Sequence, residues 1–330
     1  MKLRRLLPTL LTVGALSLAM TACTPAETET PVDDGTQYTI GVAVIVAHPA
    51  LQAVQDGFEE VLKEQGVNYT LVVENAQGDP ANAVTIASSF ADNEKIDLML
   101  AISTPIAQAI SGAETERPIL FSAVTDPVDA GLVPSWEQAG ANITGTSDLN
   151  PGAKPVALVK EAMPDATTVG VLYSTSEANS LTQLEQYKAE AAELGITIKE
   201  QGITSANEVT TGLEALGEVD AILIPTDNTV VAAISTVVAF GEDKQIPVFC
   251  ADNSTIEYGT VATRGLSYKD LGRRTGEMAV EILRDGKPVS EIAPEATTGT
   301  ELMINSAAAA KFGLTLSPEF IDSAVSDFAG

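Results

Sequence analysis

The stretch Tyr38–Gln65 reads YTIGVAVIVAHPALQAVQDGFEEVLKEQ and joins a strand pattern to a helix pattern. Its first ten residues, 38–47, form a continuous apolar run with many β-branched side chains, which is typical of a strand buried on both faces of a parallel sheet. From Pro49 onward apolar residues recur at helical spacing, and Gly66 follows at the expected end of the helix. This strand–helix unit predicts the first part of an α/β fold.

The same alternation continues along the chain. Strands are expected at 69–74, 98–102, 119–122, 143–146, 169–173, 197–202, 221–224, 247–251 and 301–304, and helices at 80–92, from 105, and at 177–194, 207–216, 229–243 and 268–284. Such alternation predicts parallel sheets with right-handed crossovers and helices on both faces.

The two halves of the chain resemble each other in the order and spacing of their strands. We therefore expect two doubly wound parallel-sheet lobes joined by a multi-stranded hinge. Lobe one comprises 38–147 plus about 262–292, and lobe two comprises 148–261 plus about 293–330.

The first 22 residues have the pattern of a signal peptide. Three basic residues precede an apolar stretch, 6–20, that is short and interrupted by Pro8 and Gly14. This favours a cleaved signal over a permanent membrane helix. The segment ends in Met-Thr-Ala before Cys23, which resembles a lipobox and predicts a lipidated cysteine. The alternative is an ordinary signal peptide with an incidental cysteine.

The charge balance is strongly acidic. The chain has 18 Lys and Arg against 45 Asp and Glu, a net charge of −27. Removal of residues 1–22 leaves 15 basic against 45 acidic residues, a net charge of −30. This argues against a nucleic-acid partner, because nothing would neutralise a run of phosphates. Residues 23–37 are acidic, contain two prolines and have no apolar periodicity, so we expect a disordered tether to the membrane.

Metal and cofactor motifs are scarce in this sequence. Two cysteines and the single histidine, His48, do not supply a disulfide scaffold or a four-ligand zinc site, and no cofactor is expected. The motifs GxGxxG after the first strand, GxxxxGK[ST], GxSxG and HExxH are absent, which argues against the corresponding enzymes. Cys250 lies in an apolar strand-like run and is expected to be a buried structural thiol.

Ligands of open parallel sheets bind beyond the carboxyl ends of the strands. The residues expected there are His48, Ser103, Thr104, Thr125, Asp126, Ser176, Asp227, Asn228 and Asp252, with Asn179 shortly after one of these ends. Hydroxyl groups and helix N-termini suit a carboxylate, and a buried aspartate suits an ammonium group. Together they point to a free amino acid.

Each of these residues also has a purely structural interpretation. Thr104, Asp227 and Asp252 precede expected helix starts and suit helix capping. His48 has no triad partner in view and suits local packing or a ligand contact better than catalysis. These alternatives stay open at the level of sequence.

From about Tyr38 to its end the sequence resembles the ABC-transporter substrate-binding lipoproteins of the tryptophan/tyrosine-uptake type. The shared blocks are AHPAL from Ala47, NAQGD from Asn75, FSAVTDP from Phe121, GTSD from Gly145, GVLY from Gly170, SEANS from Ser176 and PTDNT from Pro225. The resemblance implies a type I periplasmic-binding-protein fold. It also implies an extracytoplasmic, lipid-anchored monomer that passes a small solute to ABC permease and ATPase subunits. Aromatic amino acids are the best-known ligands of this family.

We therefore predict a non-enzymatic solute receptor whose two lobes close on an amino acid. Ser103, Thr104 and Thr125 are expected on the carboxylate side and Asp227 or Asp252 on the ammonium side. Ser176, Asn179 and Asn228 are expected as neutral donors or acceptors, and His48 and Asp126 as further ligand contacts. One alternative is the same fold with a sugar or nucleoside ligand. The other is an extracytoplasmic enzyme that uses His48.

Overall fold

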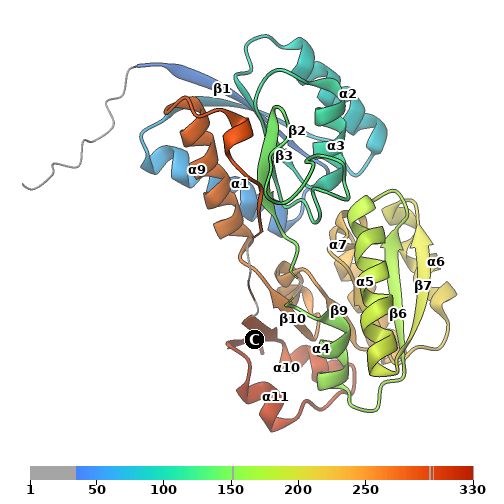
Figure 1. Cartoon of the computed structure of the whole chain (residues 1–330). Coiled ribbons are helices and arrows are strands. Elements are labelled where there is room, and N and C mark those ends of the chain that lie inside the picture. Colours follow the sequence, from blue (N-terminus) through green and yellow to red (C-terminus); the bar gives the residue numbers. More distant parts are fainter. Residues whose placement is uncertain (1–34, 151, 297–298, 300, 330) are drawn as a thin grey trace, which may run out of the picture. The chain divides into compact units, whose positions relative to one another are not determined.

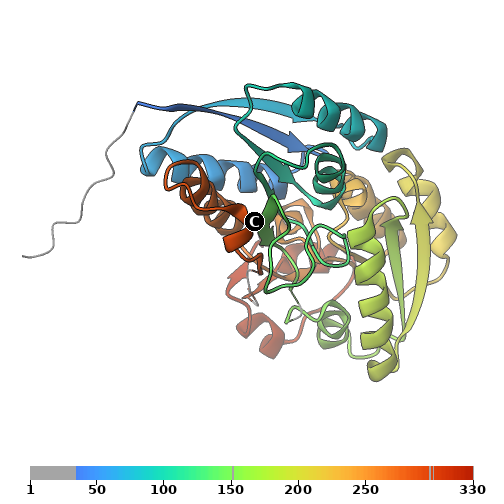
Figure 2. The same cartoon turned by 45° about the horizontal axis from the view of Figure 1, so that its top comes forward.

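The structure is a computed structural model that describes residues 35–150, 152–296, 299 and 301–329. Two mainly parallel sheets and one smaller sheet form within these residues, with helices packed on both faces of the parallel sheets (Figures 1 and 2). The predicted signal peptide, Cys23 and the tether up to Asp34 lie outside the described residues. Gln37, the last residue of the predicted tether, is instead the first residue of strand β1 (Gln37–Val44), where it pairs with Asn68. In the part described, no helix combines the length and the apolar character needed to cross a bilayer.

The first sheet has the order β11-β5-β4-β3-β1-β2, and all neighbouring strands are parallel. Its strands are β1 (Gln37–Val44), β2 (Asn68–Asn75), β3 (Leu98–Ile102), β4 (Ile119–Ser122), β5 (Ile143–Ser147) and β11 (Glu295–Ala296). Helices α1 (Pro49–Glu64) and α9 (Tyr268–Leu283) cover one face, and α2 (Pro80–Asp92) and α3 (Thr104–Ala113) cover the other (Figure 1). Because the central strands are covered on both faces, every residue of β3 is buried.

Strand β1 ends at Val44, three residues before the end of the apolar run that predicted it. The Val44 carbonyl accepts the amide of Ala76, and the Ile45 carbonyl accepts the amide of Gly78. Beyond these bonds the chain leaves the sheet, and His48 is the residue immediately before α1.

Helices α1 and α9 pack backbone to backbone. A Cβ atom built on Gly272 would lie 1.9 Å from the carbonyl oxygen of Val54, and one built on Gly57 would lie 2.1 Å from the carbonyl oxygen of Lys269. Only glycine allows this approach, since real Cβ contacts below 3.0 Å essentially do not occur. The contact attaches α9, which comes late in the sequence, to the first sheet.

The second sheet has the order β7-β6-β8-β9. Its strands are β6 (Thr168–Ser174), β7 (Thr197–Ile203), β8 (Ala221–Ile224) and β9 (Val248–Cys250). Its helices are α4 (Pro155–Ala162), α5 (Ala178–Leu194), α6 (Val209–Leu216), α7 (Asn228–Ala232) and α8 (Ile234–Lys244), with 3-10 turns η1 (Ala206–Glu208) and η2 (Asn253–Tyr258). The order matches β2-β1-β3-β4 of the first sheet, so the two halves do repeat one topology.

A third, small sheet completes the fold. It joins β10 (Ala262–Gly265), β12 (Glu301–Ile304) and β13 (Ser326–Asp327), near α10 (Ser306–Lys311), α11 (Pro318–Asp322) and the turn η3 (Val289–Glu291).

Two hydrophobic cores divide the chain between the lobes. The first is drawn from residues 40–143 and 266–292, and the second from residues 156–262 and 302–320. The chain therefore passes between the cores after β5 and again after β10. A third crossing lies between β11 and β12. Strand β11 pairs with β5 in the first sheet, and β12 pairs with β10 in the small sheet. Cys250, at the end of β9, is buried in the second core, as predicted.

Candidate functional site

The carboxyl ends of the strands in both sheets meet at one small cavity, here called the ligand cavity. Its lining residues are His48, Leu51, Ala123, Thr125, Asp148, Asn179, Thr226, Asp227, Asn228, Val231, Asp252 and Tyr268. The free volume is about 10 Å³, which is room for one water molecule. The described residues that line it include no lysine or arginine.

Several buried polar atoms on this cavity have no hydrogen-bond partner among the described residues. They are Nδ1 and Nε2 of His48, Oδ1 of Asp148 and Oδ1 of Asn179. Buried polar groups are nearly always paired, so a group of unpaired atoms around one cavity requires an explanation. Contacts with a polar ligand would satisfy them.

Asp252 follows the short strand β9 after one intervening residue, Ala251. Its Oδ1 accepts the amide of Ser254 at 2.8 Å, and its Oδ2 lies 3.9 Å from Nδ1 of His48. Burial lowers the pKa of His48 below its usual value of 6.5, although the Asp252 carboxylate acts in the opposite direction. The imidazole is therefore neutral at pH 7 and does not act as a cationic partner of Asp252.

Asp148, which sequence reasoning did not select, follows β5 directly and enters the same cavity. Its Oδ2 accepts the phenol O–H of Tyr268 at 3.1 Å, whereas Oδ1 is unpaired. Burial raises the pKa of Asp148 to about 6, and the nearby charge of Asp252 adds to this effect. Asp148 directly follows a strand, so the strand-end rule could have selected it from the sequence. The position of Tyr268, at the start of α9, was not predictable because α9 returns to the first sheet from far along the chain.

Asp227 also lines the ligand cavity, but its carboxylate is already occupied. Oδ2 accepts the amide of Ser174 at 2.5 Å and the hydroxyl of Ser180 at 2.6 Å, and Oδ1 accepts the amide of Val230 at 2.8 Å. Asp227 thereby caps α7 and ties it to β6 and α5. Burial raises its pKa to about 7 in spite of these bonds.

A second carboxylate that the sequence pattern did not single out, Glu177, binds the side-chain amides of Asn179 and Asn228 beside the cavity. Its Oε2 accepts from the backbone and side-chain nitrogens of Asn228 at 3.0 and 2.5 Å, and from Nδ2 of Asn179 at 3.2 Å. Its Oε1 accepts from the backbone and hydroxyl of Thr229 at 2.9 and 2.7 Å. Because both amide nitrogens of these asparagines point at Glu177, Oδ1 of Asn179 remains available in the cavity.

One hydroxyl pair crosses between the lobes at the cavity. Oγ1 of Thr125, after β4, lies 3.3 Å from Oγ1 of Thr226, after β8. Oγ1 of Thr104 accepts the amide of Thr125 at 3.3 Å and so supports it from behind. Thr104 itself does not line the cavity.

Three other predicted residues lie outside the cavity lining. Asp126 accepts the amides of Val128 and Asp129 in a local turn, and Ser176 is exposed and paired with Ser174. Ser103 is buried with an unpartnered hydroxyl and a backbone φ of +93°, a value that is strained for a residue other than glycine. Such strain concentrates at functional sites, and Ala123 on the neighbouring strand end, with φ +53°, shows it as well.

Comparison with known proteins identifies the family. Residues 39–327 match the family model described as ABC transporter substrate binding protein. The chain belongs to this family. Family members are the substrate-binding components of transporters, which act outside the cytoplasm in ABC importers.

This substrate-binding protein has relatives with named ligands. It is 37% identical over 278 residues, 83% of this chain and 80% of the relative, to a tyrosine-binding protein from Clostridioides difficile. It is 32% identical, with a TM-score of 0.85 over 89% of this chain and all of the other, to a Streptococcus pneumoniae domain solved in complex with L-Trp. A ligand-free, open substrate-binding protein from Clostridium difficile is 39% identical over 88% of this chain and 98% of its own, with a TM-score of 0.63.

These likenesses confirm the predicted fold class of the substrate-binding protein, a two-lobed type I periplasmic binding protein. The present structure is more similar to the tryptophan complex than to the open, ligand-free relative, although its sequence is closer to the latter. Glucose–galactose-binding and 5-methylthioribose-binding proteins are only 17% and 15% identical and share the fold alone.

Proposed function

We propose that this substrate-binding protein captures a free aromatic amino acid, with the polar groups of the ligand at the ligand cavity, and delivers it to an ABC importer. The observation that carries the proposal is the convergence of two buried carboxyl groups on one cavity: Asp148, whose Oδ1 is unpaired, and Asp252, whose Oδ2 lies 3.9 Å from Nδ1 of His48. The ligands named for the tyrosine-binding and tryptophan-bound relatives support the aromatic class.

The ammonium group of the ligand would lie between Asp148 and Asp252. A buried carboxylate is costly without a counter-charge, and the described lining residues supply no cation. A ligand ammonium group supplies that charge and can form charge-assisted hydrogen bonds to both residues.

The carboxylate group of the ligand would face lobe one. The Thr125 hydroxyl, backed by Thr104, and the imidazole of His48 are the polar groups offered there. Helix α1 begins at Pro49, next to His48, and its N-terminus carries a partial positive charge that suits an anion.

Binding without catalysis fits the surroundings of His48. Its imidazole has no hydrogen-bonded partner within the described residues, and the nearest carboxylate oxygen, on Asp252, is 3.9 Å away. A general base needs an orienting partner and a reacting group within about 3 Å. Unchanged ligand recovered after prolonged incubation with the protein would support this assignment, and turnover would overturn it.

We further propose that residues 1–22 are a cleaved signal peptide and that Cys23 carries the lipid anchor of a monomeric receptor. Residues 23–36 would then tether the folded part to the outer face of the cell membrane, near the permease through which the ATPase subunits drive uptake. Cys23→Ala should abolish labelling by a radioactive fatty acid, while a chain that starts at Thr24 should fold and bind ligand normally.

A thermal-shift screen of the twenty amino acids, ribose and a nucleoside tests the proposed ligand class. A ligand that binds only the folded protein adds about 2.7 kcal/mol at a hundredfold excess over Kd. That corresponds to a few degrees in Tm. Tryptophan, tyrosine or phenylalanine should produce the shift, and aspartate and glutamate should not, because their second carboxylate would meet Asp148 and Asp252. A shift with ribose or the nucleoside alone would replace the amino-acid assignment.

A further inference from the structure

The ligand cavity is the innermost of three spaces arranged in series. It shares Thr125, Asp148, Thr226 and Tyr268 with a second space, here called the middle compartment. The middle compartment shares Asn150, Pro155, Gln186 and Tyr187 with a surface groove along α4 and α5, here called the outer groove. No lining residue is common to the ligand cavity and the outer groove, so the middle compartment is what connects them.

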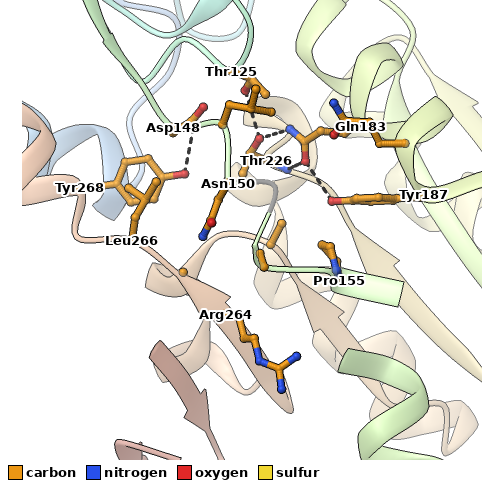
Figure 3. A pocket seen from close by; sticks show the side chains of 15 residues that line it. Thr125, Asp148, Asn150, Pro155, Gln183, Tyr187, Thr226, Arg264, Leu266 and Tyr268 are labelled. Carbon is orange, nitrogen blue, oxygen red and sulfur yellow. Dashed lines mark hydrogen bonds between the residues drawn. The ribbon is translucent and has the colours of Figure 1, made fainter. Parts of the chain in front are cut away.

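The middle compartment has the walls of a slot for a flat side chain. Figure 3 shows Tyr268 and Leu266 on one side and Tyr187 on the other, with Asn150 between them. Tyr187, Leu266 and Tyr268 are all buried. The free volume is about 50 Å³, enough for a few water molecules, so an aromatic ring would displace the side chains of Asn150 and Gln186 toward the groove.

Both tyrosine rings are held in place by hydrogen bonds. The Tyr187 hydroxyl donates to Oε1 of Gln183 at 2.9 Å, and Gln183 is in turn bonded to the backbone and hydroxyl of Thr226. The Tyr268 hydroxyl donates to Asp148. Two fixed aromatic walls favour a third ring, because offset or edge-to-face pairs of rings attract each other beyond simple burial.

The far end of the middle compartment is open rather than sealed. Gln186 is exposed at that end, and beyond it the outer groove has a free volume of about 460 Å³. The groove walls include Ala157, Ala189 and Leu194 together with the charged side chains of Lys154 and Glu193. A group attached to the outer end of a ring in the slot would therefore enter solvent-accessible space.

A different groove, beside β1, also reaches the ligand cavity through His48 and Leu51. It has a free volume of about 600 Å³ and mixed apolar and polar walls, and one of the apolar wall residues, Val73, is 47% exposed. Small-molecule sites bury most of the ligand surface, which favours the slot, whose walls Tyr187, Leu266 and Tyr268 are buried, over this more exposed groove for an aromatic ring.

We infer that the ring of the bound amino acid occupies the middle compartment and that the site accepts aromatic amino acids extended at the outer end of the ring. This inference rests on the proposed function and adds a substrate class to it, the phenylalanines whose 4-substituent is larger than the hydroxyl group of tyrosine. The exposed amide of Gln186 can donate to a polar atom at that position, such as the oxygen of tyrosine or of its O-alkyl derivatives, whereas Nδ2 of Asn150 already donates to the carbonyl of Gly299.

Calorimetric titration with L-tyrosine, O-methyl-L-tyrosine and O-benzyl-L-tyrosine tests the inference on the unmodified protein. Both derivatives should bind within about tenfold of tyrosine, a difference of about 1.4 kcal/mol or less. Binding of tyrosine with a more than hundredfold loss for both derivatives would overturn the inference and leave the proposed function standing. If none of these ligands, nor tryptophan or phenylalanine, binds, the proposed function fails and the inference fails with it.

Ala189→Trp places a large side chain in the outer groove from the exposed surface of α5. It should weaken O-benzyl-tyrosine at least tenfold and leave tyrosine unchanged. Ala192→Trp is the matched control, because Ala192 is exposed on the same helix and lies outside the groove lining. Equal effects of Ala189→Trp on both ligands, or no effect on either, would contradict the path through the groove.

Discussion

The imidazole of His48 faces the carboxylate of Asp252 across the two lobes, with Nδ1 3.9 Å from Oδ2 and side-chain exposures of 6% and 3%. His48 follows the first strand of one sheet, and Asp252 follows the last strand of the other. Because burial keeps the imidazole neutral at pH 7, His48 does not compensate the Asp252 charge. In our proposal the ligand ammonium group does so.

Asp252→Asn should therefore reduce ligand affinity. Removing one partner of a desolvated charge pair costs about 2–5 kcal/mol, which corresponds to roughly 30-fold or more in Kd, measured by calorimetry. Asp227→Asn is the matched comparison. Its oxygens are bonded to Ser174, Ser180 and Val230, so that change should lower Tm and leave Kd nearly unaltered. Full affinity in Asp252→Asn with a large loss in Asp227→Asn would reverse the two roles.

Ligand affinity should depend on pH through Asp148. Its pKa of about 6 means that the carboxylate required for an ammonium group is lost as the pH falls through 6. Kd should be lowest above pH 7 and should rise by up to about tenfold per pH unit below 6. In Asp148→Asn, affinity should be weaker at pH 7 and much less sensitive to pH between 5 and 7.

The free energy of unfolding of the ligand-free protein should also depend on pH through Asp148. It should fall as the pH rises, whereas ligand affinity should increase. A carboxyl whose folded-state pKa is raised from 3.8 to about 6 stabilises the fold while protonated, and this contribution is lost as the pH rises through 6. At pH 8 the buried charge is unfavourable, and Asp148→Asn should increase the free energy of unfolding by on the order of 2 kcal/mol. Near pH 3.5 the variant and the parent should be about equally stable in urea denaturation. A destabilised variant at pH 8 would contradict the unpaired state of Oδ1.

The α1–α9 crossing should not tolerate even one added methyl group. Gly272→Ala places Cβ against the carbonyl of Val54, so the helices must separate, and a loss of about 2 kcal/mol or more is expected in chemical denaturation. Gly112→Ala, at an exposed position of helix α3, has open space around the new Cβ and should be neutral or stabilising by about 0.4–1 kcal/mol. Helix propensity favours alanine over glycine at both positions, so a loss of stability confined to Gly272→Ala would identify the close contact as its cause. A Gly272→Ala variant as stable as the parent would contradict the close crossing.

Much of the fold was predictable because its determinants are local. The apolar run before His48 and the periodicity after Pro49 identified β1 and α1, and the repeated alternation identified both parallel sheets. The expected helix 229–243 is instead two helices, α7 and α8, that meet at Ala233. Apolar spacing alone does not reveal such a break.

The candidate site was only partly predictable. The strand-end rule placed His48, Thr125, Asn179, Asp227, Asn228 and Asp252 at one cavity, because parallel strands present their carboxyl ends at the same edge. It also selected Asp126 and Ser176, whose side chains bond within their own turns. Aspartate and serine occur both in turns and in ligand-binding sites, so the amino-acid type alone does not distinguish these two roles.

The sequence by itself determined the α/β class, the repeat of the two halves and the general location of the site, since these follow from periodicity along the chain. Only the tertiary structure decided which acids are free. Asp227 is satisfied by three donors from separate elements, whereas Asp148 retains an unpaired oxygen beside Tyr268, which is 120 residues away in the chain. The availability of a buried charge depends on its neighbours in space, and those neighbours are brought together only when the lobes fold.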